Sequence, residues 1–192
     1  MASESYSENT RNFTDKVRSL ISGSEGLSAE VRAPFQALFI PDVYRRVPGV
    51  IDALNLLNIK GVKLLGGAGW DHPGLLSGNP SALEGAIFVD GFVIPNGQNG
   101  TFENKDFVST FKNAYGVDPT ILEAYAFDTL KMVSTVLREH PGVDRTQIKQ
   151  FLLEKKNFPG VTGNISFDDT GDARRRLSVL KIVDGEIKVV GE

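Results

Sequence analysis

Two short, mainly apolar runs constrain the fold of this chain more than any other feature. Residues 62–65 (VKLL) and 86–89 (AIFV) are each long enough for one buried strand, and a glycine-bearing loop follows each at once, at residues 66–71 and 90–91. Runs that do not strictly alternate between apolar and polar residues suit strands covered on both faces, as in a parallel sheet under helices. Open α/β sheets bind ligands at the loops that leave the carboxyl ends of such strands. These loops are therefore the candidate site.

Up to residue 95 the chain alternates between predicted helices and predicted strands. Apolar residues at helical spacing predict a helix over residues 9–21. A second helical stripe predicts a helix that begins near Arg46 or bends at Pro48 and is closed by Gly61. The expected strands cover residues 35–40, 62–65 and 86–89. This alternation predicts an α/β fold, a three-layer sandwich with a mainly parallel sheet and right-handed crossovers.

After Pro95 the predicted elements change in kind. A polar, glycine-rich loop at residues 96–104 precedes helices, and Asp144 with Gln147 makes a capping box for the last of them. The predicted helices cover residues 105–115, 119–140 and 145–156. The predicted strands that follow cover residues 164–167, 177–183 and 187–190. Asp184-Gly185 predicts a C-terminal β-hairpin between the last two strands.

Three carboxylates follow predicted strands and would lie at one edge of a parallel sheet. They are Asp42, Asp71 and Asp90. Carboxylates at that edge could hold the ammonium group or the hydroxyls of a ligand. The alternative interpretation is structural: Asp42 and Asp71 would cap helices, and Asp90 would form a turn. Tyr44 would either stack on a ligand or cover the start of a helix.

The glycine loop at residues 66–74 (GGAGWDHPG) offers backbone groups rather than a nucleotide-binding motif. Its glycine spacing does not match the dinucleotide pattern, and no Lys-Ser or Lys-Thr pair completes a phosphate-binding loop. Because Gly66, Gly67 and Gly69 lack side chains, the backbone around Ala68 can approach a ligand and donate N–H groups, while Trp70 supplies an apolar wall. The alternative is a tight strand-to-helix turn in which Trp70 fills the core.

Composition and charge exclude several classes of function. A net charge of −3 and a pI near 5.5 provide no basic field for nucleic acid or for an anionic membrane surface. The chain has no cysteine, which removes disulfides and thiolate catalysis. No run approaches the roughly 20 apolar residues that span a bilayer, and the first residues lack the pattern of a signal peptide. Residues 168–172 do not fit a calcium loop, and no catalytic triad is recognisable, so we expect no enzymatic activity, no metal and no cofactor.

Five segments in order along the chain carry a family resemblance. They are FQALFIPDVYRRV, VKLLGGAGWDHPGLL, LEGAIFVDGF, FVSTFKNAYGVDPTILEAYAFDTLKMV and FPGVTGNISFDDTGDARRRLSVLKIVDGEIKVV. Together they resemble the C-terminal half of type 1 periplasmic binding proteins, the branched-chain amino-acid receptor group of ABC-transporter substrate-binding proteins. The segment ALFIPDVYRRV resembles in particular the bacterial penicillin-binding protein activators.

The resemblance implies two α/β lobes, joined by three crossovers, that close on a ligand by hinge motion. It assigns residues 1–95 to part of the second lobe. Residues 96–160 would form a helical segment of the first lobe, and residues 161–192 would return to the second lobe as strands. About half of the family's length has no counterpart here, so we expect half of a ligand cleft. Helices that lack their usual sheet also suggest a homo-oligomer.

The resemblance also implies ligand contacts from the residues that follow two of the strands. They are Pro41, Asp42 and Tyr44 after the first, and Gly67, Ala68, Gly69 and Trp70 after the second. Amino-acid-binding members usually carry an acidic residue where this chain has Ala68, to hold the α-ammonium group of the ligand. Asp71 is then the substitute, with Asp90 at the same edge.

Two functions of different classes follow from these observations. The first is a non-catalytic receptor for a small polar, amino-acid-like solute in an ABC-type uptake system. Such a receptor would be periplasmic, or lipid-anchored outside the cytoplasm, and would work with a membrane permease. The second is a protein-interaction module that regulates a cell-wall synthase, as in the penicillin-binding protein activators. The departure at Ala68 slightly favours the second.

Overall fold

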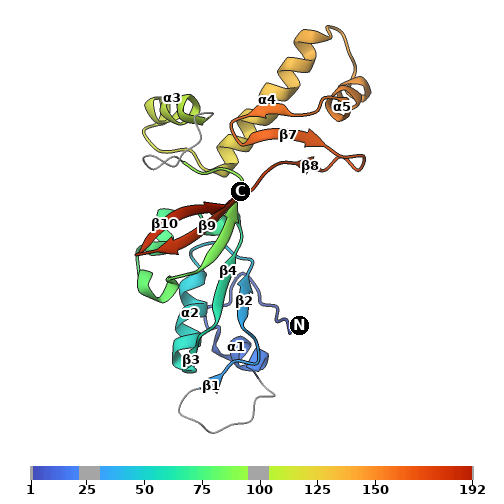
Figure 1. Ribbon diagram of the computed structural model, residues 1–192. Helices are drawn as coiled ribbons and strands as arrows, with labels where there is room; N and C mark the ends of the chain where they lie inside the picture. Colours follow the sequence, from blue (N-terminus) through green and yellow to red (C-terminus); the bar gives the residue numbers. More distant parts are fainter. Residues whose placement is uncertain (1, 22–30, 95–103, 192) are drawn as a thin grey trace. The chain divides into compact units, whose positions relative to one another are not determined.

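The computed structural model describes residues 2–21, 31–94 and 104–191 (Figure 1). The chain divides into two compact units. Unit 1 consists of Met1–Asp90 and Val179–Gly191, and unit 2 consists of Gly91–Ser178. The loop expected at residues 96–104 lies, apart from Asn104, outside the described residues.

Unit 1 is built on a five-stranded sheet in the order β10-β9-β5-β4-β2. Strands β2 (Ala37–Ile40), β4 (Lys63–Gly66) and β5 (Ile87–Asp90) are parallel neighbours. Strands β9 (Ser178–Val183) and β10 (Glu186–Gly191) are antiparallel and form the hairpin. The predicted α/β class, with a mainly parallel sheet and a C-terminal hairpin, is confirmed.

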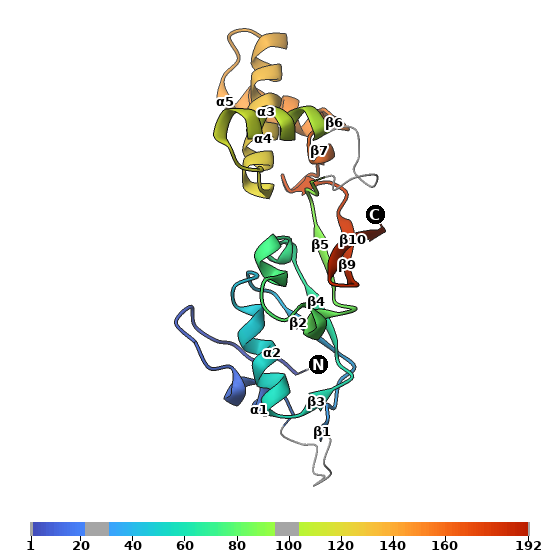
Figure 2. The same ribbon diagram turned by 90° about the vertical axis from the view of Figure 1, so that its left-hand side faces the viewer.

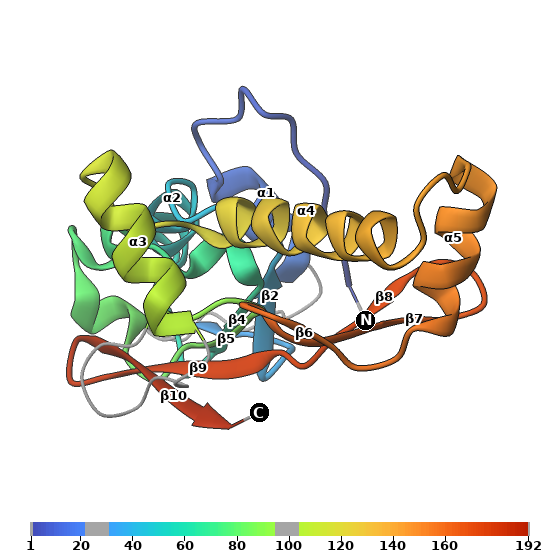
Figure 3. The same ribbon diagram turned by 90° about the horizontal axis from the view of Figure 1, so that it is seen from above.

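Two helices pack together in unit 1, α1 (Thr14–Ile21) and α2 (Val47–Leu56). Figures 2 and 3 show both on the same side of the sheet. Helix α2 begins directly after Arg46, because Pro48 is tolerated only in a first turn, where its missing N–H is not needed. The side chains that α2 buries are Val47, Val50, Ile51, Ala53 and Leu54.

Short elements that the sequence did not predict complete unit 1. Strands β1 (Val31–Arg32) and β3 (Ile59–Lys60) pair in parallel as a separate ribbon. Three 3₁₀ turns lie between β4 and β5, namely η1 (Ala68–Trp70), η2 (Pro73–Leu76) and η3 (Pro80–Leu83). Elements of two to four residues carry too little periodicity to be detected from sequence.

Unit 2 combines three helices with an antiparallel sheet. The helices are α3 (Lys105–Tyr115), α4 (Ile121–Glu139) and α5 (Arg145–Glu154). The sheet has the order β6-β7-β8, with β6 (Phe158–Gly160), β7 (Gly163–Phe167) and β8 (Ala173–Arg174). The predicted capping box of α5 is present, since Asp144 accepts from the Gln147 amide and Gln147 accepts from the Asp144 amide.

The return of the chain to unit 1 occurs later than expected. Residues 161–178 were expected to return with the final strands, but they belong to unit 2. The reason is local pairing: β7 forms an antiparallel ladder with β6, and Ile165 joins Met132 and Phe158 in a buried cluster. The chain re-enters unit 1 at Val179.

Helix α4 is apolar on more than one side. Its buried stripe includes Asp128, whose carboxylate accepts from the Val161 amide at 2.7 Å and from the Thr162 amide at 3.0 Å. These bonds fasten the turn between β6 and β7 to the helix. A second stripe remains open, with Leu122 and Leu130 about 70% exposed.

Candidate functional site at the carboxyl edge of the unit 1 sheet

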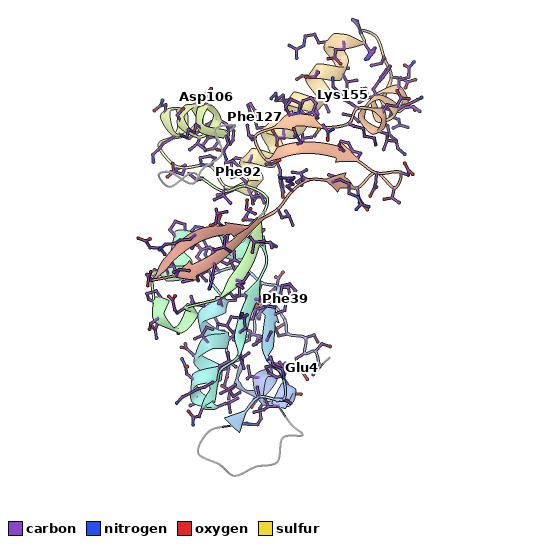
Figure 4. The ribbon with its side chains drawn as sticks, viewed as in Figure 1. Glu4, Phe39, Phe92, Asp106, Phe127 and Lys155 are labelled. Carbon is purple, nitrogen blue, oxygen red and sulfur yellow. The ribbon has the colours of Figure 1, made fainter. Side chains whose placement is uncertain are left out.

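The register of the parallel strands brings three chain reversals to one edge. Ile40 pairs with Gly66, and Gly66 pairs with Phe88 on the next strand. The segments that begin at Pro41 and Gly67 therefore leave neighbouring strands side by side, and Asp90 ends the third strand at the same edge. Strand β2 is the edge strand of the sheet, and its Phe39, labelled in Figure 4, is 58% exposed. The carboxyl ends of β2, β4 and β5 thus have the geometry expected of a ligand site in an open α/β sheet.

Trp70 lies beneath this edge rather than on its surface. Its side chain is fully buried, and its Nε1–H donates to the carbonyl of Ile40 at 3.1 Å. The ring covers Gly66, where a methyl group would lie 2.2 Å from Trp70 Cδ2. Phe88 is the neighbouring ring, with centroids 6.0 Å apart. Trp70 therefore fills the core, as in the alternative interpretation of the glycine loop, and it joins the end of β2 to the end of β4.

The loops after β2 and β4 are locked to each other. The Tyr44 amide donates to the Gly69 carbonyl at 2.8 Å, and a methyl group at Gly69 would lie 3.0 Å from the Asp42 carbonyl oxygen. The rings of Tyr44 and His72 stack at 3.8 Å and 4°. His72 Nδ1 in turn accepts from the Gly74 amide at 2.9 Å. The two loops therefore form a single wall, and Tyr44 is held within it.

Asp42 is saturated by partners that the sequence did not indicate. Its carboxylate accepts from the Tyr6 hydroxyl at 2.8 Å and from the Val43 amide at 2.7 Å, and it lies 3.0 Å from Arg46 Nε. Burial, followed by the bond to Asp42, raises the pKa of Tyr6 to about 12. Asp42 does not cap α2, whose N-cap position is Arg46 and has no side-chain cap.

Arg46 ties residues 6–13 to this wall. Its Nη atoms donate to the carbonyl of Glu8 at 2.7 Å and to that of Ser7 at 2.8 Å. Its guanidinium also lies over the rings of Tyr6 and Phe13, at 5.0 and 5.5 Å. Contacts that span nearly 40 residues leave no local signal, so sequence reasoning could not find Arg46 or Tyr6.

The other two carboxylates of the edge differ in exposure. Asp90 is 2% exposed and therefore closed to solvent. Asp71 follows η1 and is partly exposed, and burial raises its pKa to about 6. Within the described part of the chain its carboxylate has no hydrogen-bond or ion-pair partner. Asp71 does not cap η2, since His72 takes that position.

The remaining predicted site residues are accessible. Pro41 and Gly69 are exposed, and Gly67 and Ala68 are partly exposed. A side chain added at Gly67 would meet no atom within 4 Å, and the backbone there is extended at φ −109°. Gly67 therefore borders open space at the edge.

The described residues contain neither a helix that could cross a membrane nor a cluster that could hold a metal ion. None of their helices combines the length and the apolar character needed to cross a membrane. None of their His, Asp and Glu side chains gather in groups of three or more that would hold a metal ion.

The fold defined by this sheet and its edge is part of the type 1 periplasmic binding protein fold. The chain is similar to the leucine-binding protein LivK from Thermotoga maritima, with 22% identity and a TM-score of 0.73, over 97% of this chain and 49% of that chain. It is similar to LivJ from Streptococcus pneumoniae in complex with isoleucine, with 19% identity and a TM-score of 0.68, over 97% of this chain and 51% of that one.

A solute-binding protein of an ABC transporter from R. palustris, in complex with benzoate, is also similar. It is 14% identical with a TM-score of 0.67, over 97% of this chain and 48% of that chain. This chain thus spans about half the length of the solved structures it matches. No family model and no curated protein matches the sequence.

Proposed function

We propose that the chain provides one wall of a solute-binding receptor that serves an ABC-type uptake system. The observation that carries the proposal is the edge of the unit 1 sheet. There two neighbouring parallel strands deliver loops that are bonded to each other through Tyr44 and Gly69 and that leave Gly67 beside open space. Similar solved structures hold isoleucine, leucine, benzoate or 3,4-dihydroxy benzoic acid, which supports a small solute.

The chemistry of this wall suits binding rather than catalysis. Gly67 and Ala68 bring backbone groups to an accessible surface, and Pro41 and Val43 add exposed apolar atoms beside them. Binding requires only such complementary surfaces, whereas nucleophilic catalysis needs a nucleophile, a base and a group that orients the base. The receptor would act outside the cytoplasm and hand its solute to a membrane permease.

A blocking variant tests this proposal. Gly67→Phe places a large side chain in the open space without a backbone penalty, because φ at this position suits any residue. Gly78→Phe is the matched control, since a side chain at Gly78 also meets nothing within 4 Å and this glycine is exposed elsewhere in unit 1. The wild-type chain is titrated with amino acids, aromatic acids and sugars by proton–nitrogen correlation NMR, which detects millimolar binding.

The expected result is saturable shifts in the wild type and in Gly78→Phe, centred on the amides of residues 41–44 and 67–71. Gly67→Phe should abolish them while keeping a folded spectrum. Shifts that persist in Gly67→Phe would refute this location of the site. Absence of binding from every ligand class would refute the receptor function of the chain. The interaction with a cell-wall synthase has no specific observation in its favour and stays a prediction.

A further inference from the structure

His72 joins two elements of the unit 1 edge with a single imidazole ring. The ring stacks on Tyr44 of the loop after β2, with centroids 3.8 Å apart and planes at 4°. Its Nδ1 accepts from the Gly74 amide at 2.9 Å and so caps the turn η2. The order of η2 and its contact with the loop after β2 therefore both depend on this ring.

The cap requires an imidazole that is unprotonated at Nδ1. The Gly74 N–H is a donor, so Nδ1 must present a lone pair, and the proton of the neutral ring lies on Nε2. A methyl group at Gly74 would lie 2.6 Å from Tyr44 Cε2 and 3.0 Å from His72 Nδ1, so both rings rest directly on the Gly74 backbone. A second proton, at Nδ1, would place two donors face to face and abolish the cap.

The charged and titratable groups beside the ring come from both loops. On the loop after β2, Tyr44 contacts the ring, and Arg45 Nε donates to the Tyr44 hydroxyl at 2.9 Å. On its own loop, Asp71 precedes it, and burial raises the pKa of Asp71 to about 6. The Arg45 cation disfavours an imidazolium, and the Asp71 carboxylate that would favour one loses its own charge in mild acid.

The segment that His72 holds in place lies between two buried side chains. Trp70 is fully buried, and Leu75 is 1% exposed. The bond between the Tyr44 amide and the Gly69 carbonyl does not involve His72. Loss of the cap therefore releases residues 71–74 and leaves the core on both sides of them in place.

We propose that His72 is a pH-sensitive switch in this wall: the neutral ring orders residues 71–74 against the loop after β2, and uptake of a proton releases them. Histidine is the side chain that ordinarily titrates between about pH 5 and 8, so the wall is ordered at neutral pH and loosened in mild acid. The switch operates whether or not the chain binds a solute. In a receptor it would lower the affinity of this wall in mild acid.

The second histidine of the chain supplies a matched control. His140 stacks on Phe151 with the same geometry, 3.8 Å and 4°, but in the described part of the chain its ring accepts no hydrogen bond. His140→Asn therefore removes a stacked, titrating histidine that caps nothing. His72→Asn is the test variant, since an asparagine Oδ1 accepts from the Gly74 amide as Nδ1 does and takes up no proton in this range. Asp71→Asn separates the two groups that titrate side by side.

Proton–nitrogen NMR of the full chain between about pH 8 and pH 5 measures the switch. The ring signals of His72 report its protonation, and the Gly74 amide reports the cap through its chemical shift and its protection from hydrogen exchange. In the wild type, His140→Asn and Asp71→Asn, the Gly74 amide should change along the titration curve of the His72 ring. Its protection factor should fall roughly threefold or more, as expected when one hydrogen bond is lost. In His72→Asn it should stay constant.

A Gly74 amide that stays constant while the wild-type His72 ring titrates would overturn the inference without recourse to any variant. A transition that persists in His72→Asn would also overturn it, and so would one that disappears in Asp71→Asn, because Asp71 would then be the responsible group. The Trp70 indole and the Leu75 amide should keep their signals throughout. Their loss together with the Gly74 change would show that unit 1 unfolds and would refute a local switch.

Discussion

Replacing Trp70 tests the packing on which the whole edge depends. Trp70→Ala removes a fully buried ring, and large-to-small substitutions of this kind cost about 3–5 kcal/mol of the free energy of unfolding. It also removes one of two donors to the Ile40 carbonyl, which keeps the Asp42 amide as a donor at 2.9 Å, so this lost hydrogen bond adds about 0.5–1.5 kcal/mol. Trp70→Phe keeps most of the ring and loses the donor, so it should cost roughly the second amount plus a small cavity.

Gly66 provides the second half of a double-mutant cycle. In the wild type a methyl group at this position would lie 2.2 Å from Trp70 Cδ2, so Gly66→Ala should destabilise unit 1 by about 1–3 kcal/mol or more through overpacking. In the Trp70→Ala background the obstructing ring is gone, and the same methyl group should be neutral or fill part of the cavity. The two changes should therefore be non-additive by at least about 1 kcal/mol.

The assay must distinguish the two units, because each has its own core. Urea unfolding followed by NMR resonance intensities does so, with amides of β4 and β5 reporting on unit 1 and amides of α4 on unit 2. Trp70 is the single tryptophan of the chain, so its fluorescence serves only for the variants that retain it. A loss below about 1 kcal/mol in Trp70→Ala, together with equal Gly66→Ala effects in both backgrounds, would refute this description of the edge.

Three further predictions concern other parts of the chain. Asp71→Asn should raise the free energy of unfolding by up to about 3 kcal/mol near pH 8 and leave it unchanged near pH 4. The reason is that burial raises the pKa of Asp71 in the folded state from 3.8 to about 6, so the wild type loses stability as pH rises through that range. Urea unfolding at several pH values measures this difference. Asp128→Ala should cost about 2 kcal/mol or more by urea unfolding, since the buried amides of Val161 and Thr162 lose their acceptor. If the chain self-associates through α4, Leu130→Glu should lower the mass found by sedimentation equilibrium, and an unchanged mass would exclude this face.

The parts of the fold that could be predicted are those whose signal is local. The apolar runs gave β4 and β5 to within one residue at each end, and Pro48 placed the start of α2 because proline is accepted only in a first turn. The capping box at Asp144 and the Asp184-Gly185 hairpin have equally local causes. Strands of two or three residues, such as β6, exist only through their pairing partners and give no such signal.

The glycines that follow β4 show that several missing side chains in one loop can each have a different structural cause. The sequence predicts that Gly66, Gly67 and Gly69 together bring backbone close to a ligand. The structure assigns each a separate reason: Gly66 makes room for Trp70, Gly69 makes room for the loop that carries Asp42, and Gly67 alone borders open space. Sequence shows that a side chain is missing, but only the neighbours show what occupies its place.

The same reasoning explains why the location of the edge was predictable while the chemical states of its carboxylates were not. Strand register follows from local patterns, so three carboxylates could be placed at one edge from sequence alone. Their chemical states depend on distant residues: Tyr6, 36 positions away, completes the shell of Asp42, whereas no described residue does this for Asp71. A variant that removes the contacts of Tyr6 and Arg46 would therefore leave the Asp42 carboxylate without these side-chain partners, as the Asp71 carboxylate is in the wild type. The charge that this edge presents is thus decided less by the number of its acidic residues than by which of them the rest of the chain leaves without a partner.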